Sequence, residues 1–146
     1  MKSITIYTDG ACSFNPGPGG WAAILMFGIH KKEISGYEEN TTNNRMELTA
    51  VIKALQTLKE SCIISLYTDS QYVAGAFNEG WIFSWKKNNW KKSGGEIKNL
   101  DLWKVLSDEC EKHKINFIRI KGHADNEYNN RCDQLARKEI EKNFST

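Results

Sequence analysis

The sequence is poor in the features that mark membrane proteins, secreted proteins and zinc proteins. Its longest apolar runs, residues 21–27 and 62–64, are far shorter than the roughly 20 residues that a membrane-spanning helix needs. The four cysteines are widely scattered and form no CxxC pair, so neither a zinc site nor a disulfide framework is expected. The first residues contain no apolar stretch of the kind found in a signal peptide. We therefore expect a cytoplasmic protein with reduced thiols and no membrane association.

Proline and net charge are also low. Both prolines, Pro16 and Pro18, fall in one glycine-rich stretch, residues 13–20, which predicts an ordered turn-rich loop there. The net charge is only +2, so the total says little about partners. The chain has 146 residues, of which 40% are hydrophobic, and this length and composition predict one globular domain over residues 1–146.

The distribution of charge is more informative than its total. Residues 81–104 hold six lysines against Glu96 and Asp101, a balance of +4, which leaves −2 for the rest of the chain. Four of the five tryptophans lie in the same stretch. Lysines interleaved with large aromatic side chains are typical of a nucleic-acid-binding surface. The alternative is a solvated helix whose tryptophans pack on the body of the protein, and composition alone does not separate the two.

The hydrophobic pattern predicts a mixed α/β fold. Strands are predicted at residues 4–8, 21–27, 32–38, 63–68 and 115–120. Helical spacing of apolar residues, with polar residues that can cap a helix start, predicts helices after residues 42–44, after residue 70, over 102–110 and over 128–140. The first three strands have links too short for a helix and form an antiparallel meander, whereas helical crossovers make strands one, four and five parallel. The result is a five-stranded sheet with helices packed on it.

Four carboxylates are candidates for a common site. Asp9 and Asp69 each end a predicted strand after the same Tyr-Thr pair, so parallel neighbours would place both at the carboxyl edge, where ligands of α/β sheets bind. Glu47 and Asp133 lie at the margins of the apolar stripes of their helices, from which they can face the sheet. A cluster of carboxylates repels itself and raises its own pKa values, so it needs a cation, and hard oxygen ligands suit Mg²⁺ or Mn²⁺.

Each carboxylate also has a simpler interpretation. An aspartate at the end of a strand is commonly a turn or cap residue. Glu47 stands three residues after Asn44 and can complete a capping box, and Asp133 can pair with Arg137 four residues later. These residue patterns alone lead only to a candidate divalent-metal phosphate enzyme.

Six short stretches share the motifs of one family, in order and with its spacing. They are YTDGAC at 7–12, NPGPGG at 15–20, TTNNRMEL at 41–48, TDSQYV at 68–73, DLW at 101–103, and KGHA at 121–124 followed by RCD at 131–133. On these motifs the chain resembles bacterial type I ribonuclease H over nearly its whole length. The resemblance implies the ribonuclease H-like fold, with helices on both faces of the mixed five-stranded sheet, and a basic, tryptophan-rich protrusion at about residues 81–99.

The resemblance also implies an activity. It is the endonucleolytic hydrolysis of the RNA strand of RNA–DNA hybrids by in-line attack of water, leaving 5′-phosphate and 3′-hydroxyl ends. Asp9, Glu47, Asp69 and Asp133 would hold one or two Mg²⁺ ions, with Mn²⁺ as a substitute. Two such cations activate a water on one side of the phosphate and neutralise the leaving oxygen on the other. His123 matches a loop histidine that moves a proton or assists product release.

Substrate-binding residues follow from the same resemblance. Groups that recognise the 2′-hydroxyls of the RNA strand are matched by Cys12 (through its backbone), Asn15, Asn44 and Gln71. A phosphate of the DNA strand would bind at a helix N-terminus beside Thr42 and Asn43. The protrusion would contribute Trp81, Trp85, Lys86, Lys87, Lys91 and Lys92. The expected partner is the hybrid alone, bound by a monomer with no obligate protein partner.

Three other interpretations compete with this one, and the simplest, a globular domain whose acids are only structural, is opposed by the six motifs in register. Integrase- or resolvase-type nucleases share the acids but lack the stretch at 41–48 and the tryptophan-rich protrusion. A hybrid-binding module with an inactive site is opposed by the presence of all four acids and of His123.

Overall fold

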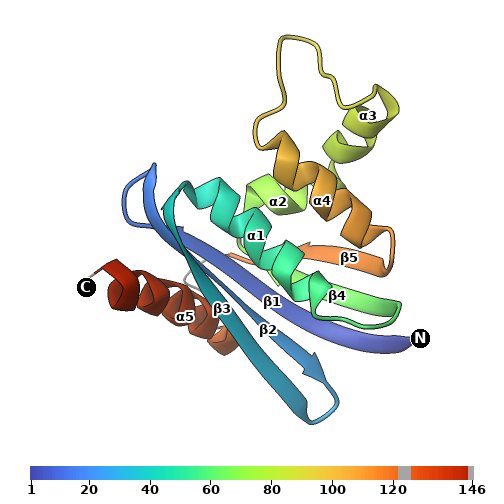
Figure 1. Cartoon of the computed structure of the whole chain (residues 1–146). Helices are drawn as coiled ribbons and strands as arrows, with labels where there is room; N and C mark the ends of the chain where they lie inside the picture. Colours follow the sequence, from blue (N-terminus) through green and yellow to red (C-terminus); the bar gives the residue numbers. More distant parts are fainter. Residues whose placement is uncertain (122–125, 145–146) are drawn as a thin grey trace.

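The computed structural model describes residues 1–121 and 126–144. Along the chain the elements are β1 (Lys2–Cys12), β2 (Gly17–Phe27), β3 (His30–Thr41), α1 (Asn43–Gln56), β4 (Cys62–Thr68), α2 (Gln71–Asn78), α3 (Trp81–Lys87), α4 (Leu100–Cys110), β5 (Lys114–Arg119) and α5 (Glu127–Phe144) (Figure 1). Within the described residues, no helix is both long enough and apolar enough to cross a membrane.

The strands form one five-stranded sheet in the order β3-β2-β1-β4-β5. β1, β2 and β3 are antiparallel neighbours, while β4 lies parallel to both β1 and β5. This arrangement confirms the predicted mixed sheet, with its meander and its three parallel strands. The parallel pairs are those joined through helices, as chain connectivity requires.

Helices cover both faces of the sheet, which confirms that expectation. α1, α2 and α4 pack on one face, and α5 packs on the other (Figure 1). Because side chains alternate along a strand, Ile6 faces the first group of helices while Tyr7 faces α5. Thr42 and Ser70 cap α1 and α2 with their side-chain oxygens, at the predicted helix starts.

The structure corrects the predicted end of the first strand. β1 does not stop at Asp9 but continues to Cys12, and β2 begins at Gly17 inside the stretch predicted as a loop. The ladder to β4 ends at the pair Tyr7–Tyr67, whereas the ladder to β2 continues as far as Cys12. Gly19 and Gly20 of that stretch lie in β2, where a Cβ atom would collide with Met46 of α1 and with Ala136 of α5, so glycine at these positions allows both helices to approach the sheet closely.

The fourth helix also differs from its predicted apolar face. Helical spacing of Leu102, Val105, Leu106 and Cys110 predicts that Val105 lies on that face, but Val105 is 40% exposed. Trp103, which the composition grouped with the basic stretch, is fully buried in the core instead. A single tryptophan buries more apolar surface than a valine, so its packing fixes the rotation of α4.

Candidate active site

Three acidic side chains from three elements meet where β1 and β4 separate. Asp9 lies in β1, Asp69 directly follows β4, and Glu47 lies in the second turn of α1. One oxygen from each carboxylate lies within 4.8 Å of the others. The structure thus brings together three of the four predicted metal-binding acids.

Gly10 makes this convergence possible. A Cβ atom on Gly10 would lie 2.5 Å from the backbone nitrogen of Glu47 and 2.5 Å from the carbonyl carbon of Met46. Real Cβ atoms do not approach backbone so closely, so the absence of a side chain lets α1 pack directly on β1. That close contact places Glu47 beside Asp9.

Asp133 reaches the same cavity from the opposite face of the sheet. α5 packs closely on β2, where a side chain at Gly20 would collide with the carbonyl group of Ala136. Asp133 lines the cavity that contains Asp9, Glu47 and Asp69, but its oxygens are not part of the tight group of three. Both of them accept a hydrogen bond from Nε of Arg137 at 3.0 Å, so the predicted pair within the helix is also present.

Burial and mutual repulsion disfavour the ionised forms of this cluster. Asp9 and Glu47 are each only 5% exposed. Burial first, and then the charges of Asp69 and Asp133, raise the pKa of Asp9 to about 8. Burial, together with the charges of Asp9 and Asp69, raises the pKa of Glu47 well above its usual value. The cluster is therefore costly to ionise unless positive charge enters it.

The donor set fits a divalent cation. Oε1 of Glu47 is buried and has no hydrogen-bond partner among the described residues. A buried carboxylate oxygen without a partner is unfavourable, and a cation would satisfy it. All the donors are carboxylate oxygens, which hard cations such as those of group 2 prefer over nitrogen or sulfur ligands. Glu47 is not needed as a cap, because Thr42 already caps the helix.

Comparison with known proteins identifies the family. The family model described as RNase H matches residues 1–141. This chain belongs to the ribonuclease H family. It is 60% identical over 141 residues to the ribonuclease H of Thermoanaerobacter sp. (strain X514), covering 96% of this chain and 91% of that protein. It is 58% identical over 144 residues to the ribonuclease H of Acetivibrio thermocellus, covering 98% of each. The chain is accordingly a hydrolase of the nuclease class.

Solved structures agree with this assignment. The crystal structure of LC9-RNase H1 superposes with a TM-score of 0.87 at 26% identity, covering 97% of this chain and 73% of that one. LC11-RNase H1, solved in complex with an RNA/DNA hybrid, gives a TM-score of 0.74 at 23% identity, covering 97% and 99% of the two chains. The latter is a likeness of fold.

Four of the expected substrate-binding residues line the cavity of these carboxylates or the groove beside it. Asn43, Asn44 and Gln71 line the carboxylate cavity, and Cys12 and Asn43 line an adjoining groove between β1 and α5. Several of these side chains already hold the local structure. Oδ1 of Asn15 accepts the Asn43 N–H at 2.9 Å, the Cys12 thiol donates to the Phe14 carbonyl at 2.7 Å, and the Gln71 amide donates to Glu79 at 3.1 Å.

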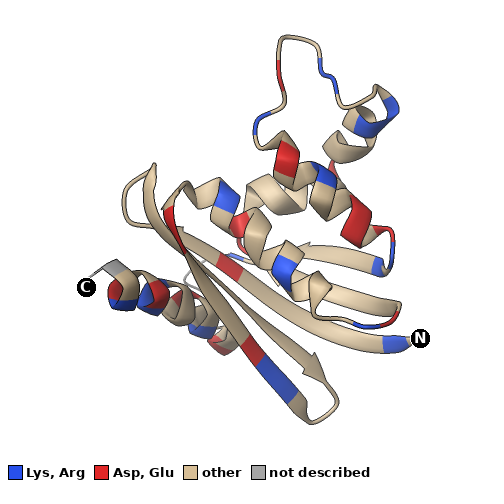
Figure 2. Ribbon diagram, viewed as in Figure 1, with Lys and Arg blue, Asp and Glu red and all other residues tan. Residues whose placement is uncertain are grey.

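The protrusion projects from the body beyond α2 and α4. Figure 2 shows lysines, in blue, on α3 and in the loop that follows it. Its tryptophans differ in exposure: Trp85 and Trp90 pack against the core, and Trp81 is 38% exposed. The packing interpretation therefore holds for Trp85. Lys86 forms an ion pair with Glu111 of α4, whereas Lys87, Lys91 and Lys92 form no ion pair with another described residue.

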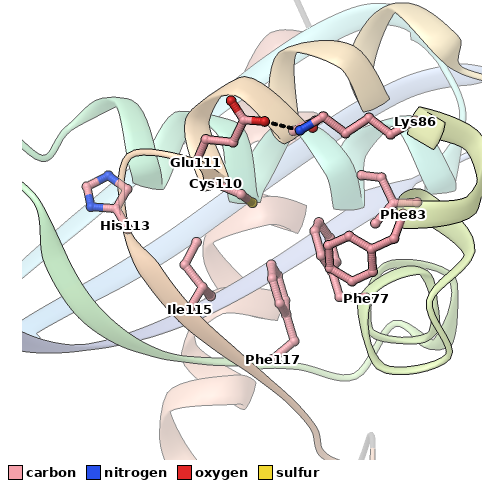
Figure 3. A pocket seen from close by; sticks show the side chains of 10 residues that line it. Phe77, Phe83, Lys86, Cys110, Glu111, His113, Ile115 and Phe117 are labelled. Atoms are coloured by element: carbon pink, nitrogen blue, oxygen red, sulfur yellow. Dashed lines mark hydrogen bonds and ion pairs between the residues drawn. The ribbon is translucent and has the colours of Figure 1, made fainter. Parts of the chain in front are cut away.

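A second cavity lies under α3 and has a different character. It is lined mainly by apolar side chains, including Phe77, Phe83 and Phe117, with the Lys86–Glu111 ion pair at its edge (Figure 3). Its one thiol, Cys110, is a poor nucleophile, because burial raises its pKa to about 12. This cavity offers no cluster of carboxylates, and its apolar walls anchor α3 to α4 and β5.

Two positions were not singled out from the sequence. Arg137 was noted only as a partner of Asp133, yet it lines both the carboxylate cavity and the adjoining groove. Arg45, in the first turn of α1, donates to both carboxylate oxygens of Asp101 at 3.0 and 2.8 Å and so joins α1 to α4. No local spacing could reveal the second pair, because its members are 56 positions apart. His123 lies outside the described residues.

Proposed function

We propose that this ribonuclease H hydrolyses the RNA strand of RNA–DNA hybrids at the carboxylate cavity, leaving 5′-phosphate and 3′-hydroxyl ends. The observation that carries the proposal is the convergence of Asp9, Glu47 and Asp69 oxygens within 4.8 Å in a member of this family. Asp133, on the wall of the same cavity, is the fourth acid of the proposed site.

Asp9, Glu47, Asp69 and Asp133 are proposed to hold one or two Mg²⁺ ions, which Mn²⁺ can replace. The raised pKa of Asp9 and of Glu47 and the unpartnered Glu47 oxygen support a need for positive charge at this place. Bound there, divalent cations supply activation of the attacking water and neutralisation of the leaving 3′ oxygen. The protein contributes carboxylates held by β1, α1 and α5 and by the residue directly after β4, so their arrangement is set before the substrate binds.

Recognition of the hybrid requires one strand with 2′-hydroxyls and one without. The Cys12 backbone and the amides of Asn15, Asn44 and Gln71 are proposed to bind the RNA strand, since amides can both donate to and accept from a 2′-hydroxyl. Gln71 must leave Glu79 to do so. Thr42 and Asn43 are proposed to bind a DNA phosphate at the start of α1, where the helix dipole favours an anion.

Further from the cleavage point, the protrusion is proposed to bind the backbone of the hybrid. Lys87, Lys91 and Lys92 form no ion pair with another described residue. Their positive charges can therefore bind phosphates without recognising the base sequence. Trp81 and Trp85 hold the protrusion in place. His123 is proposed to transfer a proton at the attacking water or the leaving group. We also place the enzyme in the cytoplasm, in keeping with four free cysteines.

The test is cleavage of end-labelled RNA–DNA hybrid, duplex DNA and duplex RNA of one sequence, with Mg²⁺ or with EDTA. We expect cleavage of the hybrid RNA strand only, and only with Mg²⁺. Asp69→Asn should abolish it, whereas Asp108→Asn, at an exposed acid of α4, should not. Equal cleavage of duplex DNA, or full activity of Asp69→Asn, would contradict the proposal.

A further inference from the structure

Arg137 occupies a distinctive position beside the proposed metal site. Among the described residues that line the carboxylate cavity and the adjoining groove, it is the only cation. It lies on α5 one turn beyond Asp133, and its Nε donates to both oxygens of that carboxylate at 3.0 Å. The same guanidinium borders the groove that contains Cys12 and Asn43. One positive charge thus contacts the fourth acid and faces the proposed path of the substrate.

We propose that Arg137 is an exchangeable counter-charge of the site. It neutralises Asp133 while no divalent cation is bound, and it turns to a phosphate of the RNA strand when a cation takes the Asp133 oxygens. This assignment rests on the proposed function, because it requires both a cation and a nucleic acid at the cavity.

The difference between Asp133 and the other acids supports the exchange. Asp9, Glu47 and Asp69 form the tight group of three, while Asp133 contacts Asp9 at the margin of that group and has both oxygens engaged by Arg137. The Asp133 and Arg137 side chains are 42% and 67% exposed. An exposed ion pair contributes little to stability, so it can open when a stronger ligand arrives. A guanidinium released there can bind phosphate with two parallel N–H groups.

The exchange predicts two effects of opposite sign when the charge at position 137 is removed. Cation binding to the substrate-free protein should become tighter, because a competing and repelling charge is lost. Hybrid binding should become weaker, because a phosphate loses its partner. An arginine that merely orients Asp133 predicts weaker cation binding instead, since its loss would release the carboxylate from its place.

The first experiment is calorimetric titration of substrate-free protein with Mn²⁺ and with Mg²⁺ at low ionic strength. We expect Arg137→Gln to lower the dissociation constant roughly 3- to 10-fold, the range for one unit charge about 6–12 Å from a dication in water. Arg137→Lys should stay close to the wild type. Arg131→Gln is the matched control, because Arg131 lies on the same helix and pairs with Glu33 at 2.8 Å, outside both cavities.

The second experiment is steady-state cleavage of a hybrid at several salt concentrations with saturating Mg²⁺. Arg137→Gln should raise KM and reduce the slope of log KM against log salt by about 1, the value for one phosphate contact. Its kcat should change little, and Arg137→Lys should restore both KM and slope.

Cation binding by Arg137→Gln that equals or falls below that of the wild type would overturn the assignment, as would an unchanged KM and salt slope. A wild-type protein that binds no divalent cation and cleaves no hybrid would overturn the proposed function itself, and the assignment with it.

Discussion

At the scale of single residues, Gly10 and Asp9 show that the carboxylate cluster lowers the stability of the fold. Gly10 brings the backbone of α1 against β1, which forces the carboxylates of Glu47 and Asp9 into one buried place. Neighbouring like charges out of water destabilise the fold. A site of this kind is unfavourable on its own and becomes favourable only when a cation enters it.

The titration of Asp9 gives a prediction about pH. The pKa of Asp9 rises from 3.8 in the unfolded chain to about 8 in the fold, so the stability it confers is complete below pH 3.8 and is lost as the pH rises through about 8. Asp9→Asn cannot ionise. In EDTA it should therefore raise Tm by several degrees more at about pH 9 than at about pH 5, since 1 kcal/mol shifts Tm by about 2–4 °C at this size.

The measurement is thermal unfolding of both proteins at the two pH values, with and without Mg²⁺. Mg²⁺ should stabilise the wild type and leave Asp9→Asn nearly unchanged. If Asp9→Asn is no more stable than the wild type at alkaline pH, the ionised Asp9 carboxylate does not destabilise the fold. Asp9→Asn should also abolish cleavage of the hybrid, because the substitution removes the charge of a proposed metal ligand without a change of size.

Gly10→Ala tests the close approach of α1. The added Cβ overlaps backbone atoms of Met46 and Glu47, and backbone cannot move aside as a flexible side chain does. We expect a loss of about 1–3 kcal/mol in the free energy of unfolding, typical of overpacking. The kcat should fall by up to about 100-fold as Glu47 is displaced. Ser3→Ala, at an exposed position of the same strand, should be neutral in both assays.

His123→Ala tests the proposed proton transfer. Because general acid–base assistance contributes about 10²–10⁴-fold, and the histidine is proposed to hold no cation, kcat should fall by roughly 100-fold or less. Calorimetric binding of Mg²⁺ should stay at the wild-type value. Loss of both activity and Mg²⁺ binding would make His123 a ligand instead.

At the scale of elements, the protrusion combines a packed side with a charged side. The ring centroids of Trp85 and Trp103 lie 5.5 Å apart in an edge-on contact, and Trp103 is fully buried. The Lys86–Glu111 pair ties α3 to α4 next to the apolar cavity of Figure 3. Aromatic packing and this ion pair therefore support α3 while the remaining lysines face outward.

Replacing Lys87, Lys91 and Lys92 together with alanine separates charge from packing. Each phosphate contact contributes a slope of about 0.9 to the dependence of log affinity on log salt in B-form DNA, so the triple variant should flatten it by up to about 3. KM should rise while kcat stays constant, because the four acids are untouched. Adding Lys86→Ala to the triple variant should change KM and the salt slope further only if the ion pair between Lys86 and Glu111 opens when the hybrid binds.

Steady-state cleavage of a hybrid at several salt concentrations measures the KM, kcat and salt slope of the triple lysine variant. An unchanged KM and salt slope would show that the segment is a solvated helix with no part in binding. Trp85→Ala is the contrasting variant: it should unfold at lower denaturant concentration, because it removes a packed aromatic side chain, whereas the triple lysine variant should keep the stability of the wild type.

At the scale of the whole molecule, we propose that the protein is a monomer. Among the exposed large apolar side chains, Phe14 follows β1 and Ile29 lies in the β2–β3 turn, while Trp81 and Phe83 share α3. A stable dimer needs a contiguous apolar face, which scattered side chains do not provide. We expect sedimentation equilibrium to give 16.7 kDa at all concentrations tested. A mass that rises with concentration would contradict this.

The sequence by itself determined the five strands and their helices, and it supplied the four acids as candidates. Thr42 and Ser70 identified two helix starts, and apolar periodicity identified the five strands, because capping and side-chain period are local properties. The family motifs contain all four acids. In the fold, the carboxylate oxygens of Asp9, Glu47 and Asp69 lie within 4.8 Å of one another.

Only the tertiary structure decided how these parts meet. It extended β1 through Asp9, since pairing with β2 continues after β4 has separated from it. It buried Trp103, a residue that composition had grouped with the basic surface, because burial depends on which elements pack together. It also placed Arg137 between Asp133 and the groove. Spacing along α5 could not show this position, because the groove also includes residues of β1 and α1 that are distant in the chain.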